Sequence, residues 1–290
     1  MQLLKKGDTI GLIACSDGLR PDKDAQTLTT VEQVLHSLQL HTMRANTLFH
    51  GESTPFSGSA KERALALMAL FNNPHVQAIF DVSGGDSANQ ILPFLDFEAI
   101  RCSHAFYSGI SDLSVINNAL IHYKAAKVFH YRINNLAGSD AKQQTRWFQN
   151  AFMEPQSVPA IHYDWLRGSQ MHGKIIGGNL RCFLKLAGTS FSPDPAGKII
   201  FLESLGGGPA RTASLLAQLD QIGVFSVCQG LLLGTFSEME RKKLKPSAAQ
   251  LVLEITDRYQ LPVARTSQLG HGEDAIGIQL GIEQNFSHLG

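Results

Sequence analysis

The sequence predicts an α/β protein of two domains, an N-terminal domain with a doubly wound parallel sheet and a C-terminal α/β domain. Short apolar runs alternate along the chain with longer segments in which apolar residues recur every three or four positions. Strands that alternate with helices in this way form a parallel sheet with helices on both faces. The alternation stops near residue 134 and resumes near residue 174. We therefore expect an N-terminal domain at 1–135, a connector at 136–168 and a C-terminal domain at 169–290.

The first half contains five expected strands. They are short, mainly apolar runs at 9–15, 42–47, 76–82, 105–107 and 127–131. Amphipathic spacing predicts the helical segments between and after them, at 21–38, 61–71, 87–95 and 113–123.

The second half continues the same pattern. Strands are expected at 174–178, 198–203, 230–236 and 261–265, and helices at 179–187, through 215–222 and at 246–259. In the connector only one short helix is expected, around 142–151. The tail at 275–282 alternates apolar with small or polar residues, which is typical of a closing hairpin.

Charge and cysteine content narrow the classes of function. The chain has 25 Lys and Arg against 25 Asp and Glu, so no basic surface indicates a nucleic-acid partner. The four cysteines, Cys15, Cys102, Cys182 and Cys228, lie far apart without zinc-ligand spacing, so we expect no metal, no cofactor and a reducing compartment. The N-terminal apolar run is too short for a signal peptide, and no window is long enough to cross a membrane. These observations predict a cytoplasmic globular protein.

Ser111 lies on a tight turn between a strand and a helix. The strand at 105–107 ends before Gly109, and helical spacing begins at Leu113. A serine on such a turn holds its hydroxyl out from the sheet edge, and the helix dipole favours negative charge beside it. This geometry suits a nucleophile, although the usual Gly-x-Ser-x-Gly spelling is absent. The alternative is that Ser111 or Asp112 only caps the helix.

Two further polar residues stand at the ends of expected strands. Glu203 ends the apolar strand at 198–203, and His271 lies between two glycines after the strand at 261–265. A serine, a histidine base and a carboxylate that orients the histidine are the groups that nucleophilic acyl transfer needs. Each residue alone has a simpler explanation, a surface glutamate and an incidental histidine.

Six segments occur in one order over nearly the whole chain. They are GDTIGLIA from Gly7, SGGDSANQILPFLD from Ser83, GISD from Gly109, GGNL with LAGT between Gly177 and Thr189, GKIIFLE from Gly197, and LPV with GHGED between Leu261 and Asp274. With these segments the chain resembles the LD-carboxypeptidase family of serine peptidases, which also includes the microcin C immunity peptidases. The resemblance implies an enzyme of two α/β domains with its active site at their interface.

The resemblance also implies roles for the residues at the strand ends. Ser111 would be the nucleophile, His271 the general base and Glu203 the group that orients the histidine. The backbone N–H groups of Gly85 and Asp112 would form the oxyanion hole, which stabilises a tetrahedral oxyanion by several kcal/mol. The reaction would pass through an acyl-enzyme without a metal. Family members are often dimers, so the resemblance allows a homodimer.

The sequence departs from the family pattern at two places. Many carboxypeptidases of the family have Gly-Gly-Tyr at the glycine pair, whereas this chain has Asp86 as the third residue, a spelling closer to the immunity peptidases. A common His-Gly-Pro element is His130-Tyr131-Arg132 here. We expect Asp86 and Arg132 to contact the substrate, and Arg132 to bind a free carboxylate through two parallel N–H groups. The alternative for Arg132 is a solvated surface side chain.

The predicted activity is hydrolysis of an amide bond near the C-terminus of a murein tetrapeptide. One alternative keeps the chemistry and changes the substrate to a peptidyl- or aminoacyl-nucleotide, as in microcin C immunity. The other alternative is a non-catalytic protein that binds a small molecule. The expected partner is a small peptide or a peptidyl-nucleotide, with neither nucleic acid nor membrane.

Overall fold

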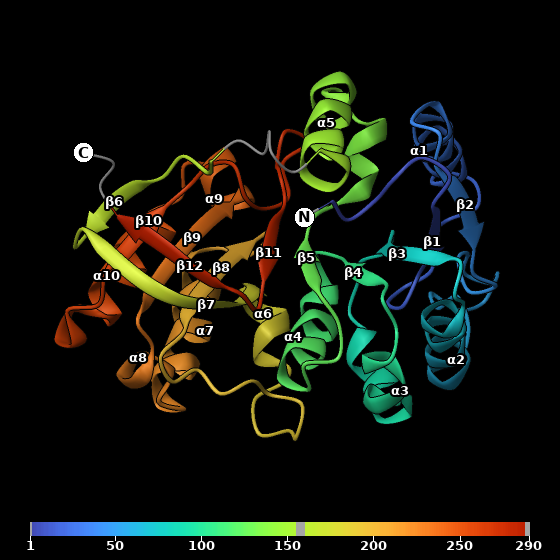
Figure 1. Ribbon diagram of the computed structural model, residues 1–290. Helices are drawn as coiled ribbons and strands as arrows, with labels where there is room; N and C mark the ends of the chain where they lie inside the picture. The colour runs from blue at the N-terminus through green and yellow to red at the C-terminus, as the bar shows by residue number, and fades with distance from the viewer. Residues whose placement is uncertain (1, 155–159, 288–290) are drawn as a thin grey trace.

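The computed structural model describes residues 2–154 and 160–287, and Figure 1 shows two α/β halves side by side. Each half contains one six-stranded sheet. The predicted fold class is confirmed, because both sheets are mostly parallel and helices alternate with their strands along the chain. No helix in the described part of the chain is long and apolar enough to cross a membrane.

The first sheet has the strand order β11-β5-β4-β3-β1-β2. Its strands are β1 (Thr9–Ile13), β2 (His41–Arg44), β3 (Val76–Asp81), β4 (Phe106–Ser108), β5 (Val128–His130) and β11 (Ile278–Leu280). The first five run parallel to one another, and β11 runs antiparallel beside β5. The strand order changes direction between β1 and β3, which is where open parallel sheets place a crevice at their carboxyl edge.

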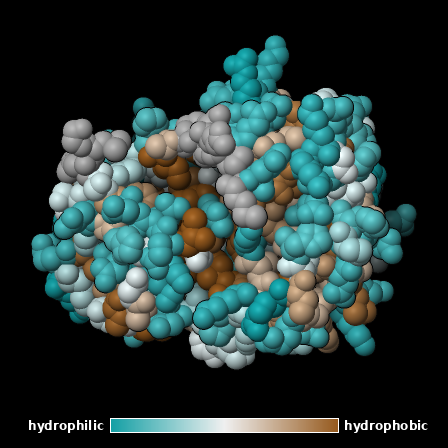
Figure 2. Space-filling view, in the orientation of Figure 1, coloured by the Kyte–Doolittle hydropathy of each residue, from teal (hydrophilic) through white to brown (hydrophobic). Residues whose placement is uncertain are grey.

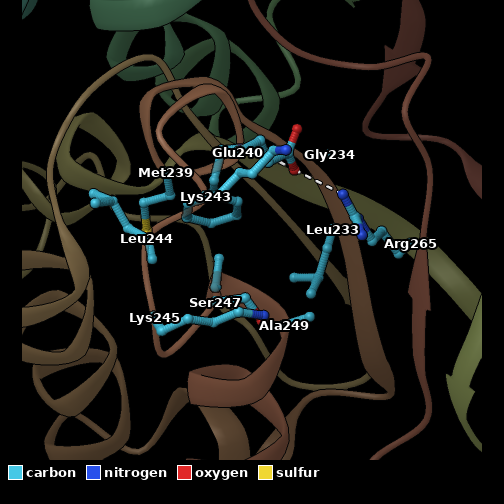
Figure 3. Close-up of a pocket in the computed structure, with 12 residues that line it drawn as sticks. Leu233, Gly234, Met239, Glu240, Lys243, Leu244, Lys245, Ser247, Ala249 and Arg265 are labelled. Carbon is cyan, nitrogen blue, oxygen red and sulfur yellow. Dashed lines mark hydrogen bonds and ion pairs between the residues drawn. The ribbon is translucent and has the colours of Figure 1, made fainter.

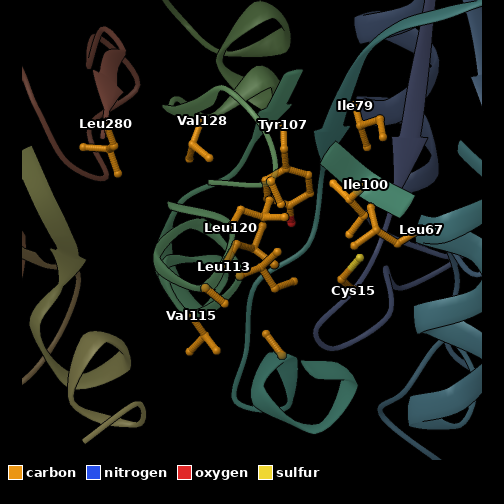
Figure 4. Packing of buried hydrophobic residues seen from close by; sticks show 14 of the residues in the cluster. Cys15, Leu67, Ile79, Ile100, Tyr107, Leu113, Val115, Leu120, Val128 and Leu280 are labelled. Carbon is orange, nitrogen blue, oxygen red and sulfur yellow. The ribbon is translucent and has the colours of Figure 1, made fainter. Parts of the chain in front are cut away.

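Helices cover both faces of the first sheet because its central strands are apolar on both faces. Ala78 and Phe80 of β3 belong to one buried cluster and Ile79 to another, as the alternation of side chains along a strand requires. Figure 4 shows part of the cluster that contains Ile79, with Tyr107 and Leu113 from the next unit of the chain. The helical segments of this half are α1 (Ala25–Ser37), α2 (Ala60–Asn72), η1 (Ala88–Phe94), α3 (Phe97–Arg101), η2 (Ser111–Leu113), α4 (Ser114–His122), η3 (Ile133–Ala137), α5 (Ala141–Phe148) and η4 (Gln149–Met153).

The second sheet has the order β12-β7-β8-β9-β10-β6. Its strands are β6 (Asp164–Arg167), β7 (Gln170–Asn179), β8 (Ile199–Ser204), β9 (Gly230–Phe236), β10 (Val263–Arg265) and β12 (Glu283–Ser287). The four central strands are parallel, and β6 and β12 are antiparallel edges. The helical segments are α6 (Leu180–Leu184), α7 (Pro209–Gln221), α8 (Val224–Val227), α9 (Ser237–Arg241), α10 (Ala248–Ile255) and η6 (Asp257–Tyr259).

The C-terminal tail joins both sheets, so the predicted hairpin at 275–282 is wrong. Strand β11 pairs with β5 of the first sheet, and β12 pairs with β7 of the second sheet. Alternation along the tail indicates which side chains face a core, but it does not identify the strand that lies alongside. The tail therefore ties the two halves together.

The connector contains more packed structure than its sequence indicates. The predicted short helix is confirmed as α5, and Trp147, Phe148 and Phe152 in this stretch are buried against the first half. Strand β6, which we did not predict, pairs with β10 at the edge of the second sheet. Residues 155–159 of the predicted connector lie outside the described residues.

Buried hydrogen bonds join the helix that follows Ser111 to the second sheet. The side-chain amide of Asn118 donates to the Gly177 carbonyl at 2.7 Å and accepts from the Gly177 N–H at 2.9 Å. The N–H of Asn179 donates to Ser114 Oγ at 2.9 Å. Figure 2 shows a mostly hydrophilic surface, with hydrophobic residues gathered in the hollow along the middle of this face. The two halves are thus joined beside the turn that carries Ser111.

Candidate active site

Ser111 lies in a strained turn at the carboxyl end of β4. The chain leaves β4 at Ser108 and enters η2 and then α4. Ser111 has a φ of 61°, a left-handed conformation that costs a non-glycine residue about 1–2 kcal/mol. The capping alternative is wrong, because the N-cap of α4 is Leu113 and no side chain caps this helix. A strained serine between a strand and a helix is typical of a nucleophile.

One pocket contains both Ser111 and His271. Its volume is about 630 Å³. The loops that follow each of the strands β1 to β5 line it from the first half, and Leu205 and His271 line it from the second half. The pocket therefore lies at the carboxyl edge of the first sheet, where parallel sheets place their ligands.

Glu203 and His271 form a buried pair. The distance from His271 Nδ1 to Glu203 Oε2 is 2.5 Å, the Glu203 carboxylate is fully buried, and the His271 side chain is 6% exposed. An ionised carboxylate only accepts hydrogen bonds, so Nδ1 carries the proton and Nε2 is left as an acceptor. No described residue hydrogen-bonds to Nε2. The pair can therefore present a basic nitrogen to a ligand in the pocket.

The structure does not join Ser111 directly to His271. Among the described residues, no hydrogen bond links Ser111 Oγ to His271 Nε2, and Nε2 lies without a partner. Such contacts are often long in a site without substrate and shorten in the complex. The structure thus places Ser111 and His271 in one pocket, and of the two expected hydrogen bonds it contains the one between His271 and Glu203.

The glycine pair after β3 lies against Ser111. A Cβ atom added at Gly84 would lie 3.9 Å from Ser111 Oγ. Gly85 has a φ of 130°, and a Cβ there would overlap the Asp17 carboxylate at 2.2 Å, so this position accepts only glycine. Asp112 follows Ser111 directly. The backbone N–H groups of Gly85 and Asp112 thus belong to the two loops that flank the serine hydroxyl.

The other two predicted residues have different surroundings. Asp86 is not among the described residues that line the pocket. Its carboxylate instead forms ion pairs with Arg181 and Lys185 of the second half. Arg132 lines the pocket, and its guanidinium has no hydrogen bond or ion pair to another described residue. Arg132 is exposed at the pocket surface, and its partial desolvation there lowers the pKa of the guanidinium, a shift that the nearby Glu273 and Asp24 carboxylates oppose.

His130 is a further residue beside this site, and we predicted no role for it. It ends β5, is buried, and neither ring nitrogen has a hydrogen-bond partner among the described residues. Burial lowers its pKa to about 4, the Glu203 carboxylate opposes the shift, and His271 adds to it. His130 is therefore neutral at neutral pH. Its place after a parallel strand, on the same edge as Ser111, is the signal that could have identified it.

A second pocket, of about 300 Å³, lies in the second half between β9 and α10 (Figure 3). Its walls combine apolar side chains such as Leu233 with Lys243, Lys245 and Arg265. Arg265 is paired with Glu240, and the only serine of the described lining, Ser247, caps α10. This pocket lacks a histidine among its described residues, so it is not a candidate for acyl transfer. No group of three or more His, Cys, Asp or Glu that could hold a metal occurs in residues 2–154 and 160–287.

The chain matches two family models that together cover most of its length. The LD-carboxypeptidase N-terminal domain matches residues 10–131, and the LD-carboxypeptidase C-terminal domain matches residues 172–286. The chain belongs to the LD-carboxypeptidase family. Members of this family are serine hydrolases, so the chain is an enzyme, and the non-catalytic alternative is wrong.

The curated relatives include murein carboxypeptidases and a microcin self-immunity protein. The chain is 25% identical to a probable murein peptide carboxypeptidase of Bacillus subtilis over 97% of this chain and 89% of the relative. It is 26% identical to the murein tetrapeptide carboxypeptidase of Pseudomonas aeruginosa over 91% of this chain and 88% of the relative. It is also 23% identical to the microcin C7 self-immunity protein of Escherichia coli, over 97% and 90% of the two chains.

Solved structures show the same fold. The wild-type self-immunity protein without ligand superposes with a TM-score of 0.86 at 21% identity, over 97% of this chain and 93% of that chain. The muramoyltetrapeptide carboxypeptidase of Oxalobacter formigenes superposes with a TM-score of 0.79 at 23% identity, over 96% and 94%. The self-immunity protein has also been solved with aspartyl sulfamoyl adenosine and with glutamyl sulfamoyl guanosine.

Proposed function

We propose that this LD-carboxypeptidase removes the terminal residue of a murein tetrapeptide through Ser111, His271 and Glu203. His271 Nε2 takes the proton of Ser111 Oγ as the oxygen bonds to the scissile carbonyl carbon. The carbonyl oxygen becomes an oxyanion and accepts hydrogen bonds from the N–H groups of Gly85 and Asp112.

Breakdown of this intermediate releases the terminal residue. The C–N bond breaks, and the protonated His271 gives its proton to the leaving amine. The acyl group remains on Ser111 as an ester. Water gives a proton to His271 as its oxygen bonds to the ester carbon; the bond from that carbon to Ser111 Oγ then breaks, and His271 returns the proton to Oγ. Glu203 stays ionised throughout and stabilises the imidazolium. The 2.5 Å contact between His271 and Glu203 supports this assignment.

The observation that carries the choice of substrate is an unpaired cation in the pocket of the nucleophile. Arg132 and Ser111 follow the parallel neighbours β5 and β4, so their loops open on the same edge of the sheet. The other arginine of the described pocket lining, Arg20, already pairs with Asp24 at 3.0 Å. A free terminal carboxylate is the group that two parallel N–H donors of Arg132 fit.

A peptidyl-nucleotide substrate has weaker support. The residues after the glycine pair, Asp86 and Ser87, favoured this substrate in the sequence. In the structure Asp86 pairs with cations of the second half, and the buried Ser87 hydroxyl donates a hydrogen bond to Asp17. Proteins commonly stack nucleobases on aromatic side chains. The described lining of the pocket contains no Phe, Tyr or Trp.

Three substrates test the proposal. The purified enzyme is given a murein tetrapeptide, the same tetrapeptide with an amidated C-terminus, and aspartyl sulfamoyl adenosine, and product release is followed by mass spectrometry. The proposal predicts rapid cleavage of the free tetrapeptide and slow cleavage of the other two. Preferred cleavage of the sulfamoyl nucleoside would replace the murein substrate with the nucleotide alternative.

A further inference from the structure

Two cations of the second half, Arg181 and Lys185, reach the loops that flank Ser111. Arg181 lies in α6, and Lys185 is four residues later at its end, so both side chains project from one face. Arg181 Nη2 donates to the carbonyl oxygen of Gly85 at 3.2 Å, and Lys185 Nζ donates to the carbonyl oxygen of Asp86 at 2.8 Å. The second half thus holds the loop after β3 through its backbone.

Lys185 also holds the turn that contains Ser111. Its Nζ atom donates to Asp112 Oδ1 at 2.5 Å. The other oxygen, Oδ2, accepts from Ser16 Oγ at 2.7 Å and from the Ala88 N–H at 2.8 Å. The Asp112 side chain is fully buried, and a buried carboxylate needs both its hydrogen bonds and a counter-charge. Lys185 supplies that charge by direct contact.

These contacts restrict the direction of the Gly85 N–H. The peptide between Gly84 and Gly85 is planar, and its carbonyl oxygen accepts from the Asp17 N–H at 3.1 Å. In a trans peptide the N–H points opposite to that carbonyl, so the Gly85 N–H is directed away from the Asp17 N–H. Arg181 holds the next carbonyl, which limits rotation about the flexible backbone of Gly85.

The charges of this cluster balance. Two cations, Arg181 and Lys185, contact two carboxylates, Asp86 and Asp112, so the formal sum is zero. A neutral cluster adds little electrostatic field at Ser111. Its hydrogen bonds, in contrast, hold both flanking loops against one helix, so its effect on the site is geometric.

We propose that Lys185 and Arg181 are positioning residues for the oxyanion hole. Through Asp112 and the carbonyls of Gly85 and Asp86, they keep the two N–H donors aligned with the substrate oxygen. The inference rests on the proposed function, in which the N–H groups of Gly85 and Asp112 bind the oxyanion. Docking of the second half then has two effects: it brings the base to the nucleophile, and it sets the donors that stabilise the intermediate.

The main test compares Lys185→Met with Lys185→Arg. The methionine variant keeps the length of the side chain without its charge, and a misplacement of about 1 Å in a site can cost about 100-fold in rate. We expect kcat to fall about 100-fold while KM changes less than about threefold, because the donors act mainly in the transition state. The Ki of a peptide boronic acid, whose oxygen occupies the oxyanion hole, should rise in parallel. Lys185→Arg should recover most of both losses.

A second variant keeps the test decisive if Lys185→Met does not fold. Arg181 is 30% exposed, and Arg181→Gln removes one contact to Gly85 and one to Asp86, so a folded variant with a kcat loss of about tenfold is expected. Lys142→Met, at an exposed lysine of α5, is the matched control and should match the wild type. Variants with a lower melting temperature but unchanged kcat and boronate affinity would overturn the inference, since the cluster would then be only structural.

Failure of the inference can be told from failure of the proposed function. A fluorophosphonate probe reports whether Ser111 is the reactive serine in each variant. If Ser111→Ala still turns over substrate, the proposed function fails. If Ser111→Ala is inactive and both Lys185→Met and Arg181→Gln have wild-type kcat, only the positioning role fails.

Discussion

His271 Nδ1 donates a hydrogen bond of 2.5 Å to Oε2 of Glu203, whose carboxylate is fully buried. Both residues come from the second half of the chain, whereas Ser111 follows β4 of the first half. The pair fixes the tautomer in which Nε2 of His271 is free to accept a proton. The His271 ring is therefore oriented before a substrate binds, and the docking of the two halves sets its distance from Ser111.

The first prediction follows from this pair. In Glu203→Gln the amide can donate to Nδ1 and favour the tautomer that protonates Nε2, so kcat should fall by about 10⁴-fold. The substitution keeps the volume of the side chain, so far-UV circular dichroism should match the wild type. Glu254→Gln, on the exposed side of α10, is the control and should keep full activity. A Glu203→Gln enzyme within about tenfold of the wild type would remove Glu203 from the mechanism.

The second prediction concerns the strained backbone of Ser111. Ser111→Ala and Ser111→Gly should both lose activity by several orders of magnitude, because each removes the hydroxyl that we propose as the nucleophile. At a φ of 61° glycine is less strained than alanine, so the free energy of unfolding of Ser111→Gly should exceed that of Ser111→Ala by about 1 kcal/mol. Urea unfolding of the two variants measures this difference. Equal stabilities would show that the turn relaxes without cost.

The polar residues at the ends of strands are the part of the site that could be predicted from the sequence. Continuous apolar runs identify the parallel strands, and the polar residues after them then lie at one edge of a sheet. Ser111 and His271 line one pocket, and Glu203 contacts His271. The roles of the three residues remain a prediction, because a shared pocket does not establish which atoms react.

Contacts between distant segments could not be predicted from the sequence. Spacing places Arg181 and Lys185 on one face of a helix, but their partners, Asp86 and Asp112, belong to the other half. The sequence placed Asp86 in the loop beside the site, and we therefore expected it to contact the substrate. The sequence did not show that Arg181 and Lys185 pair with its carboxylate. The three residues of β11 likewise carry no signal for the first sheet, because register and partner depend on tertiary packing.

The third prediction is a pH dependence of stability that arises from His130. Its pKa is about 4 in the folded enzyme against 6.5 for an exposed histidine, so the unfolded chain binds its proton first as the pH falls. Stability should therefore be lost as the pH falls from 6.5 to about 4, by up to about 3 kcal/mol, and should stay constant above this window. Glu203 and His271 face His130, and the other ionisable groups of the enzyme form a background from which the contribution of His130 must be separated.

A variant separates His130 from that background. His130→Leu keeps the site apolar and removes the titration, so the difference in unfolding free energy between the wild type and this variant should change with pH only inside the same window. His75→Leu, at an exposed histidine, is the control and should leave the pH profile unchanged. A difference that does not vary with pH would mean that His130 has the same pKa in the folded enzyme and in the unfolded chain.

The last prediction concerns Arg132 and the anionic end of the substrate. Loss of a bidentate contact to a carboxylate should raise KM for the free tetrapeptide about tenfold or more in Arg132→Ala, which corresponds to about 1.4 kcal/mol. Hydrolysis of the same tetrapeptide with an amidated C-terminus should hardly change, because the group that Arg132 binds is absent. Steady-state kinetics on the two substrates gives both values.

Arg20 provides the matched control for this experiment. It lines the same pocket, but its guanidinium is held by Asp24 at 3.0 Å and is not free for a ligand. Arg20→Ala should therefore change KM for either substrate by less than about threefold, as expected for an exposed ion pair. An Arg132→Ala variant that affects both tetrapeptides equally would show a general effect on the pocket. An Arg132→Ala variant with no effect on either would leave Arg132 as a solvated side chain and remove the observation on which the carboxypeptidase substrate rests.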